Sequence, residues 1–152
     1  MQEGVEAPDF ELQSSNDSTV KLSSFKGQKN VVLCFYPKNH LFACPSKLVF
    51  KNAKSTISAY PQILALDSVL FAISVDTVES QKEFVNEYKI QYLHLSDPKK
   101  IACKTYAGLN LAGLAKRSTF IINKEGKIAR IFRNINVDSH GNEIVEALKN
   151  LK

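Results

Sequence analysis

Cys44 is the residue whose neighbours most favour side-chain chemistry. The range 31–36 holds six consecutive apolar or aromatic residues, which suit a strand buried on both faces of a sheet. Pro37 then ends this strand, and Cys44-Pro45 precedes apolar positions at the spacing of a helix with one buried stripe. Those positions are Val49, Ala53, Ile57, Tyr60 and Leu64. The sequence therefore predicts a cysteine at a turn from strand to helix.

This predicted position has consequences for the Cys44 thiol. Proline is favoured as the first residue of a helix, because its missing N–H would have no partner there, so Pro45 makes Cys44 the expected N-cap. The free amides of the first turn and the helix dipole stabilise a thiolate. A thiol with a pKa near ~8.5 is about 3% ionised at pH 7, whereas a pKa near ~6 makes it mostly thiolate. Cys44 is therefore a candidate nucleophile; the alternative is a small buried side chain before a helix.

Several segments resemble one protein family. The segment 35–38, FYPK, followed by a cysteine that opens a helix, resembles the active-site segment of the peroxiredoxins. The residues of this segment are nearest to those of the bacterioferritin comigratory protein or peroxiredoxin Q branch. The segment 117–128, RSTFIINKEGKI, resembles that family's R-x-T-F-x-I-D-x-x-G-x-I pattern. The segments GVEAPDFEL, KLSSFKG and DSHGNEIVEALKNL also resemble their counterparts, in order along nearly the whole chain.

Strands and helices are expected to alternate in the middle of the chain. A second apolar strand is predicted at 68–75, and a helix follows it with Asp76 or Thr77 as N-cap. The segment 92–95 is a shorter candidate strand, before a helix that starts at Asp97-Pro98. The first of these helices is expected to bury Phe84, Val85 and Tyr88, and the second carries Ile101, Cys103 and Tyr106. This progression predicts parallel strands joined by right-handed crossovers.

Hairpins are expected near both ends. One, over 10–22, would cover an edge of the sheet, and another joins 119–123 to 127–133 after a loop of small residues. The final helix has Ile144, Val145, Leu148 and Leu151 on one side. A β-α-β unit followed by β-β-α is the thioredoxin-like arrangement, and the resemblance implies the same α/β fold. We expect one such domain over 1–152, with a central mixed sheet and its site at the carboxyl ends of strands.

Arg117 is the second candidate site residue. It stands at the entrance to a predicted buried strand, which is a poor place for an isolated cation unless an anion is close by. The resemblance places it beside the cysteine, where its charge would lower the thiol pKa and its donors would hold peroxide oxygens. Without the resemblance, a surface arginine at the end of a loop would be the simpler interpretation.

The resemblance implies a thiol-dependent peroxidase with an antioxidant role. The Cys44 thiolate would attack the O–O bond of hydrogen peroxide or an organic hydroperoxide, leaving a sulfenic acid and water or an alcohol. An external thiol such as thioredoxin, glutaredoxin or glutathione would then reduce the sulfenic acid. The reaction requires no metal, haem or other cofactor.

The active-site motif departs from the family pattern. The family's P-x-x-x-T/S-x-x-C motif maps onto Pro37, Leu41 and Cys44, so a leucine replaces the hydroxyl that normally positions peroxide. By analogy with the removal of one transition-state donor, this loss would cost on the order of 10²–10³ in rate. His40 is a candidate substitute donor; the alternative is an exposed loop histidine with no role.

The resolving cysteine is not evident from the sequence. Members of this branch often carry one five residues after the nucleophile, where this chain has Val49. Cys34 lies inside the first predicted strand and is interpreted as a core residue, and Cys103 is expected to pack against the sheet. The simplest interpretation is a one-Cys peroxiredoxin; a Cys44–Cys103 disulfide after local unfolding is the alternative.

Composition and charge restrict the partners. The chain has 152 residues, 44% of them hydrophobic, and three cysteines, an odd number that fits a reducing compartment. No apolar run approaches a membrane span and no export signal is evident, so we expect a cytoplasmic protein, as a monomer or homodimer. The net charge is +5, and the excess of basic residues lies after residue 98. No nucleic-acid motif accompanies these residues, so we expect no nucleic acid to bind. His94 and His140 lack metal-ligand spacing.

Two further functional classes are alternatives to the peroxidase. One is a protein of the same fold with little turnover that works as a redox sensor or binding module, which the missing threonine permits. The other is a thiol–disulfide oxidoreductase, which is disfavoured because there is no C-x-x-C: Cys44 alone could form mixed disulfides but could not release them internally.

Overall fold

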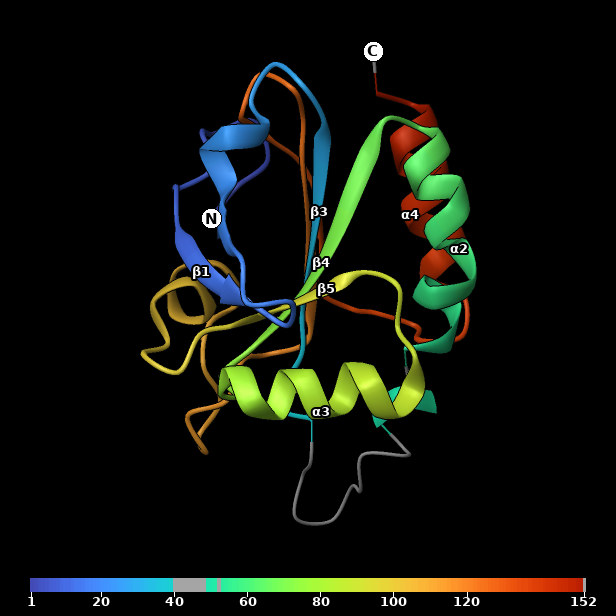
Figure 1. Ribbon diagram of the computed structural model, residues 1–152. Helices are drawn as coiled ribbons and strands as arrows, with labels where there is room; N and C mark the ends of the chain where they lie inside the picture. Colours follow the sequence, from blue (N-terminus) through green and yellow to red (C-terminus); the bar gives the residue numbers. More distant parts are fainter. Residues whose placement is uncertain (40–48, 52, 152) are drawn as a thin grey trace.

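The chain folds around a mixed β-sheet (Figure 1). The computed structural model describes residues 1–39, 49–51 and 53–151. The strands in this part of the chain are β1 (Glu11–Ser14), β2 (Thr19–Lys21), β3 (Asn30–Phe35), β4 (Ser68–Ser74), β5 (Leu93–Ser96), β6 (Ser118–Ile122) and β7 (Ile128–Phe132). They form one seven-stranded sheet in the order β2-β1-β5-β4-β3-β6-β7. A mixed sheet flanked by helices is the architecture that the sequence predicts.

The strand β3 lies at the centre of this sheet. It pairs in parallel with β4 and antiparallel with β6, so that Leu33 faces Phe71 on one side and Phe120 on the other. The strand β5 continues the parallel part beside β4. Helices and loops cover both faces of β3, which is why this strand needs apolar residues at successive positions rather than at alternate ones. The predicted central strand and its parallel partner are confirmed.

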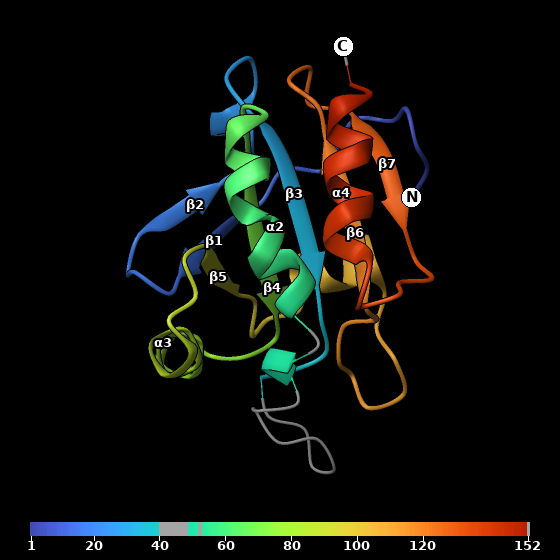
Figure 2. The ribbon, with the colours of Figure 1, turned by 90° about the vertical axis from the view of Figure 1, so that its right-hand side faces the viewer.

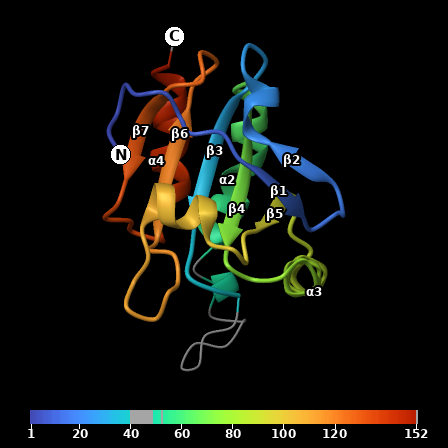
Figure 3. The same cartoon turned by 90° about the vertical axis from the view of Figure 1, so that its left-hand side faces the viewer.

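Alternate residues of β3 contribute to two separate hydrophobic clusters. Val31, Leu33 and Phe35 pack on one face with residues of the N-terminal segment and of two short helical turns, η1 (Leu22–Phe25) and η2 (Cys103–Ala107). Figure 3 looks onto this face. Val32 and Tyr36 pack on the opposite face, against the long helices. The sheet therefore separates Cys103 from whatever lies on the Tyr36 face.

Two helices lie side by side on the Tyr36 face, α2 (Lys54–Ala65) and α4 (His140–Lys149) (Figure 2). They touch closely at Gly141, where an added Cβ would lie 2.1 Å from the carbonyl oxygen of Ser55. No side chain fits in that space, so the contact requires glycine. The predicted stripe of α4 is confirmed at Ile144, Val145 and Leu148, which are all buried.

The predicted buried stripe of α2 was wrong in part. Val49 is buried, but Leu64 is 46% exposed, and the buried positions of α2 are Thr56, Ala59 and Ile63. The helix α2 begins only after Ala53, so the spacing counted from Val49 does not continue through it as one helix. Contact with both the sheet and α4 turns the side with Ala59 inward, and this contact could not be read from periodicity.

The helix α3 (Val78–Tyr88) begins as predicted. The Thr77 side chain caps it by accepting a hydrogen bond from the Ser80 amide, at 3.2 Å. Phe84 is buried, as expected, together with Gln81, whose burial was not predicted. A polar side chain at this position requires partners inside the protein, and these are described with the site.

The predicted helix from Asp97-Pro98 was wrong in its start. Helical structure begins at Ile101, after Lys100, whose φ of 62° lies outside the helical region, and it continues as the π-type turn η2. The Asp97 carboxylate accepts hydrogen bonds from the amides of Ile101 (3.0 Å) and Cys103 (2.7 Å). Asp97 therefore caps the turn from several residues upstream. Cys103 and Tyr106 are buried, as expected, while Ile101 is exposed.

Both edges of the sheet are extended by N-terminal residues. The predicted hairpin, β1 and β2, joins the sheet through antiparallel pairing of β1 with β5. At the other edge, the Gly4 amide donates to the Ile128 carbonyl (2.7 Å) and the Ile128 amide donates to the Val5 carbonyl (2.9 Å). The predicted C-terminal hairpin, β6 and β7, is confirmed between these contacts and β3.

Candidate active site

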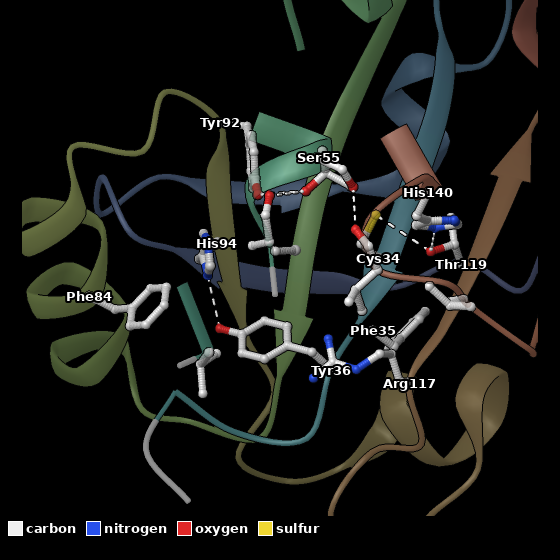
Figure 4. A pocket seen from close by; sticks show the side chains of 16 residues that line it. Cys34, Phe35, Tyr36, Ser55, Phe84, Tyr92, His94, Arg117, Thr119 and His140 are labelled. Atoms are coloured by element: carbon white, nitrogen blue, oxygen red, sulfur yellow. Dashed lines mark hydrogen bonds between the residues drawn. The ribbon is translucent and has the colours of Figure 1, made fainter. Parts of the chain in front are cut away.

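A cavity opens at the carboxyl end of β3, between the sheet, the start of α2 and the segment before α4 (Figure 4). It encloses about 540 Å³, its open mouth included. Aromatic side chains form much of the wall, and they are Phe35, Tyr36, Phe84 and Tyr92. The polar and reactive side chains on the wall are Cys34, Ser55, Thr56, His94, Arg117, Thr119 and His140.

Described residues on either side of the predicted active-site segment line this cavity. Tyr36 donates the last ladder bond at this end of β3, from its amide to the Ile73 carbonyl (3.1 Å), and Pro37, which lacks an N–H, ends the pairing as expected. His40, Leu41 and Cys44 lie outside the described residues, so their predicted roles stay predictions. Tyr36 before this segment and Val49 after it both line the cavity.

Arg117 lies on the cavity wall, at the position immediately before β6. The register pairs Phe35 with Ser118, so Arg117 extends β6 toward the end of β3. All five residues of β6 are buried, which confirms that Arg117 stands at the entrance to a buried strand. Its positive charge lowers the pKa of Cys34, against the larger opposite effect of burial. The electrostatic influence of Arg117 therefore reaches a sulfur atom in this cavity.

A buried polar network ties the end of β3 to α3 and β5. The Tyr36 hydroxyl lies 2.9 Å from Nδ1 of His94 and 3.0 Å from Oε1 of Gln81, and it also bonds Oδ1 of Asn39. The Asn39 amide nitrogen Nδ2 donates to Oε1 of Gln81 at 2.9 Å. This network explains the buried Gln81 and fixes the chain as far as Asn39.

Asp76 holds the same part of the chain from the end of β4. Its Oδ2 atom accepts hydrogen bonds from the backbone amide of Asn39 (2.8 Å) and the hydroxyl of Ser74 (2.6 Å), and its Oδ1 accepts one from Ser80 (3.3 Å). Sequence reasoning considered Asp76 only as a helix cap. Its observed role is to anchor the loop that leads to the predicted nucleophile.

His94 is buried in the wall of the cavity. Burial lowers its pKa to about 3, so the imidazole is neutral at physiological pH. Its Nδ1 atom lies 2.9 Å from the Tyr36 hydroxyl, and its Nε2 atom has no hydrogen-bond partner in the structure as far as it is described. The sequence offered one signal for this burial, because His94 sits between two leucines in a candidate strand.

Cys34 also borders the cavity, and it is only partly the core residue that the sequence suggested. Its Sγ lies 3.6 Å from Oγ1 of Thr119, and that same oxygen lies 2.7 Å from Nε2 of His140. Burial raises the pKa of Cys34 to about 11, although the Thr119 hydrogen bond and Arg117 oppose this effect. Cys103, in contrast, packs in the cluster on the opposite face of the sheet, as expected.

Residues 1–39, 49–51 and 53–151 contain neither a membrane-spanning helix nor a cluster of metal ligands. No helix there is both long enough and apolar enough to cross a membrane. No group of three or more His, Cys, Asp or Glu side chains in that part lies close enough to hold a metal ion.

Comparison with known proteins assigns the chain to a family. The model of the AhpC/TSA family matches residues 4–131. Peroxiredoxin Bcp of Bacillus subtilis is 33% identical over 157 aligned residues, covering 97% of this chain and 95% of that protein. A putative peroxiredoxin bcp of Coxiella burnetii is 30% identical, covering 95% of this chain and 97% of the relative.

Solved structures have the same fold. The Xylella fastidiosa PrxQ structure matches with a TM-score of 0.86 at 23% identity, covering 98% of this chain and 96% of that one. Peroxidoxin BcpB from Mycobacterium tuberculosis matches with a TM-score of 0.84 at 24% identity, covering 100% and 99%. The thioredoxin-like fold predicted from the sequence is confirmed. The chain belongs to the AhpC/TSA family and is a peroxiredoxin of the bacterioferritin comigratory protein and peroxiredoxin Q type, a thiol-dependent peroxidase.

Proposed function

We propose that peroxide is reduced at the mouth of the cavity at the end of β3, with Cys44 as the peroxidatic cysteine and Arg117 as its cationic partner. The Cys44 thiolate attacks one peroxide oxygen, the O–O bond breaks, and the second oxygen leaves as water or an alcohol after taking up a proton. Cys44 is left as a sulfenic acid. The substrates are hydrogen peroxide and organic hydroperoxides.

The position of Arg117 is the observation that carries this proposal. Its guanidinium lies on the wall of a cavity that the chain borders both before and after the segment 40–48, at Tyr36 and Val49. A fixed positive charge there stabilises both the thiolate and the negative charge that develops on the departing oxygen. The effect of Arg117 on the pKa of Cys34 supports this role, because it is the same effect on a neighbouring sulfur.

The other residues of the proposed site differ in part from the family motif. Pro37 closes the end of β3, and Leu41 takes the place of the hydroxyl that relatives use, with His40 as the candidate replacement donor. A leucine neither donates nor accepts hydrogen bonds, so we expect turnover slower than in relatives that retain the threonine, by on the order of 10²–10³. An antioxidant role at low peroxide flux is compatible with that rate.

The regenerating electrons come from an external thiol such as thioredoxin, glutaredoxin or glutathione. Three cysteines in 152 residues fit a reducing environment, and we assign the reaction to the cytoplasm of a cell, with the protein working as a monomer or homodimer.

Rapid mixing of the reduced protein with hydrogen peroxide tests the proposal. We expect Cys44 to be oxidised far faster than a free thiol, with the rate lost in Cys44→Ser, lowered in Arg117→Gln and raised in Leu41→Thr. Cys103→Ser is the matched control, because it removes a buried thiol from the other face of the sheet. A rate no greater than that of free cysteine in every form would contradict the assignment of Cys44.

A further inference from the structure

The loop between η2 and β6 presents apolar side chains to the solvent. Figure 3 shows this loop projecting beyond the end of the sheet. Its segment 109–115, LNLAGLA, carries apolar side chains or none at every position except Asn110. Leu111 is fully exposed, whereas the next most exposed large apolar side chain among the described residues, Ile101, is 61% exposed. Surface loops are ordinarily polar, so packing within this chain does not explain an apolar one.

Hydrogen bonds within the loop hold Leu111 in its exposed position. Asn110 Oδ1 accepts hydrogen bonds from the amides of Ala112 (2.9 Å) and Leu114 (3.1 Å). The Asn110 amide donates to the Leu114 carbonyl (2.8 Å). The single polar side chain of the segment is thus occupied by the loop's own backbone. Leu111 projects from a closed turn, so its transfer into an apolar environment would cost little further ordering of the chain.

Lysine side chains flank this loop on both sides. The Nζ atom of Lys100 lies against Gly113, where an added Cβ would meet it at 2.7 Å. The Lys116 side chain lies 3.8 Å from the position of a Cβ added to Gly108. Two further lysines are exposed at the start of the same segment of the chain. We call Leu111 and these four lysines the basic tip; the lysines are Lys99, Lys100, Lys104 and Lys116.

No acidic side chain offsets the charge of the basic tip. The sequence has neither Asp nor Glu between Asp97 and Glu125. Asp97 itself is buried and accepts hydrogen bonds from the amides of its own turn. In the part of the chain that the structure describes, no ion pair includes any of the four lysines. An exposed leucine and uncompensated positive charge therefore share one surface.

We propose that the basic tip binds the surface of an anionic lipid bilayer, with Leu111 inserted at the acyl boundary and the lysines on headgroup phosphates. Binding at such an interface strengthens with buried apolar area and with basic residues near anionic lipids. The basic tip supplies both, and it needs no apolar run long enough to span the membrane. Lys116 directly precedes Arg117, so the bound protein holds that wall of the cavity near the headgroups. The proposal does not depend on the chemistry proposed for Cys44.

Two other kinds of partner fit the basic tip less well. A two-fold contact with a second copy would bring each basic tip onto its counterpart, and facing like charges oppose association. A folded acidic protein would need a recess that matches the projecting leucine, whereas a bilayer admits an apolar side chain at any point of its surface. The cytoplasmic leaflet carries anionic lipids, which agrees with a protein that works in the cytoplasm.

Cosedimentation with vesicles tests the charge of the surface. We expect the protein to bind vesicles of phosphatidylglycerol and phosphatidylcholine in equal parts, but not vesicles of phosphatidylcholine alone. Binding should be lost at about 1 M salt, where the Debye length falls to ~3 Å. In the combined variant Lys100→Gln, Lys104→Gln and Lys116→Gln, we expect binding about 10²-fold weaker, because each lysine contributes about fivefold.

A second triple variant removes the same charge from exposed positions outside the basic tip. It combines Lys26→Gln, Lys54→Gln and Lys127→Gln, and we expect it to weaken binding by less than about fivefold. Equal losses in the two triple variants would show that only net charge matters and would overturn the basic tip as the binding surface.

A single fluorophore tests the insertion of Leu111, because the chain contains no tryptophan. In Leu111→Trp we expect the emission to shift to shorter wavelength on anionic vesicles, and lipids brominated on their acyl chains should quench it. Leu64→Trp is the matched control, since Leu64 is 46% exposed on α2, and it should show neither effect. Leu111→Gln should weaken binding by about tenfold. Equal quenching in the two tryptophan variants, or quenching in neither, would overturn the insertion.

Sedimentation equilibrium without lipid distinguishes the other partners. A dimer that Leu111→Gln dissociates, together with no binding to anionic vesicles, would assign the tip to a second copy and overturn the proposal. A protein that stays monomeric and binds no vesicles would also overturn it and would leave an acidic protein as the partner. Neither result would bear on peroxide reduction at Cys44, which is measured without lipid.

Discussion

The hydroxyl of Tyr36 and the Nδ1 atom of His94 face each other at 2.9 Å, and this contact determines the state of both side chains. The hydroxyl has one proton, which it donates to Asn39 or Gln81, so it accepts from His94. His94 must therefore carry its proton on Nδ1 and present an unprotonated Nε2. The polar network that holds the loop before Cys44 thus also fixes which nitrogen of His94 carries the proton.

The Tyr36 hydroxyl can be removed with little change in shape. Tyr36→Phe leaves buried polar atoms of Asn39 and His94 without a partner, and we expect it to lower the free energy of unfolding by about 1–3 kcal/mol. Urea denaturation measures this loss. Tyr60→Phe is the matched control, since that ring is partly exposed and its hydroxyl has no buried hydrogen-bond partner among the described residues. Equal losses in the two variants would show that the network contributes nothing.

Protonation of buried histidine should make the protein sensitive to mild acid. The folded pKa of His94 is about 3 against an ordinary value of 6.5, so below pH 6.5 the unfolded chain binds a proton that the folded chain does not. Stability therefore falls as the pH drops from 6.5 toward 3, by up to about 1.4 kcal/mol per pH unit. Urea titrations between pH 7 and 5 check this slope, and His94→Gln should flatten it. An unchanged slope in that variant would assign the acid sensitivity to other groups.

Asp76 offers a test of the loop anchor. Asp76→Asn retains one acceptor oxygen where two are used, so at least one of the donors from Asn39, Ser74 and Ser80 loses its partner. We expect a loss of about 1–3 kcal/mol in stability and a slower reaction with peroxide, because the loop that leads to Cys44 is held less firmly. Denaturation and rapid mixing measure the two effects. Asp67→Asn, at an exposed ion pair with Lys29, should change neither rate nor stability as much.

Gly141 tests the contact between α2 and α4. Alanine is the better helix former by roughly 0.5–1 kcal/mol, but its Cβ would meet the Ser55 carbonyl oxygen at 2.1 Å. Forcing the helices apart costs typically 1–3 kcal/mol, so we expect Gly141→Ala to be destabilising by thermal or urea denaturation. Asn142→Ala, one residue further along the exposed side, should be neutral or slightly stabilising. A more stable Gly141→Ala would show that the helices separate freely.

Features within one element were predictable, whereas those formed between elements were not. Continuous apolar runs identified β3 and β4, and the position of Arg117 before a run of strand formers identified the entrance to β6. The buried side of α2 depends on α4, which no local pattern contains. The hydrogen-bonded contacts of Thr119 with Cys34 and His140 were not predicted for the same reason: Cys34 and Thr119 are 85 residues apart, and Thr119 and His140 are 21 apart. His94 looked unimportant because its partners also come from distant elements.

The pairing of the N-terminal residues with β7 also matters for the order of events during synthesis. Gly4 and Val5 are synthesised long before Ile128, their backbone partner. The central strand β3 likewise lacks one of its two neighbours until residues 118–122 have been made. Contacts this distant in sequence are slow to close. A nascent chain that stops before residue 118 would therefore expose one side of its central strand. Chaperones that bind extended apolar segments can bind this strand until β6 has been made.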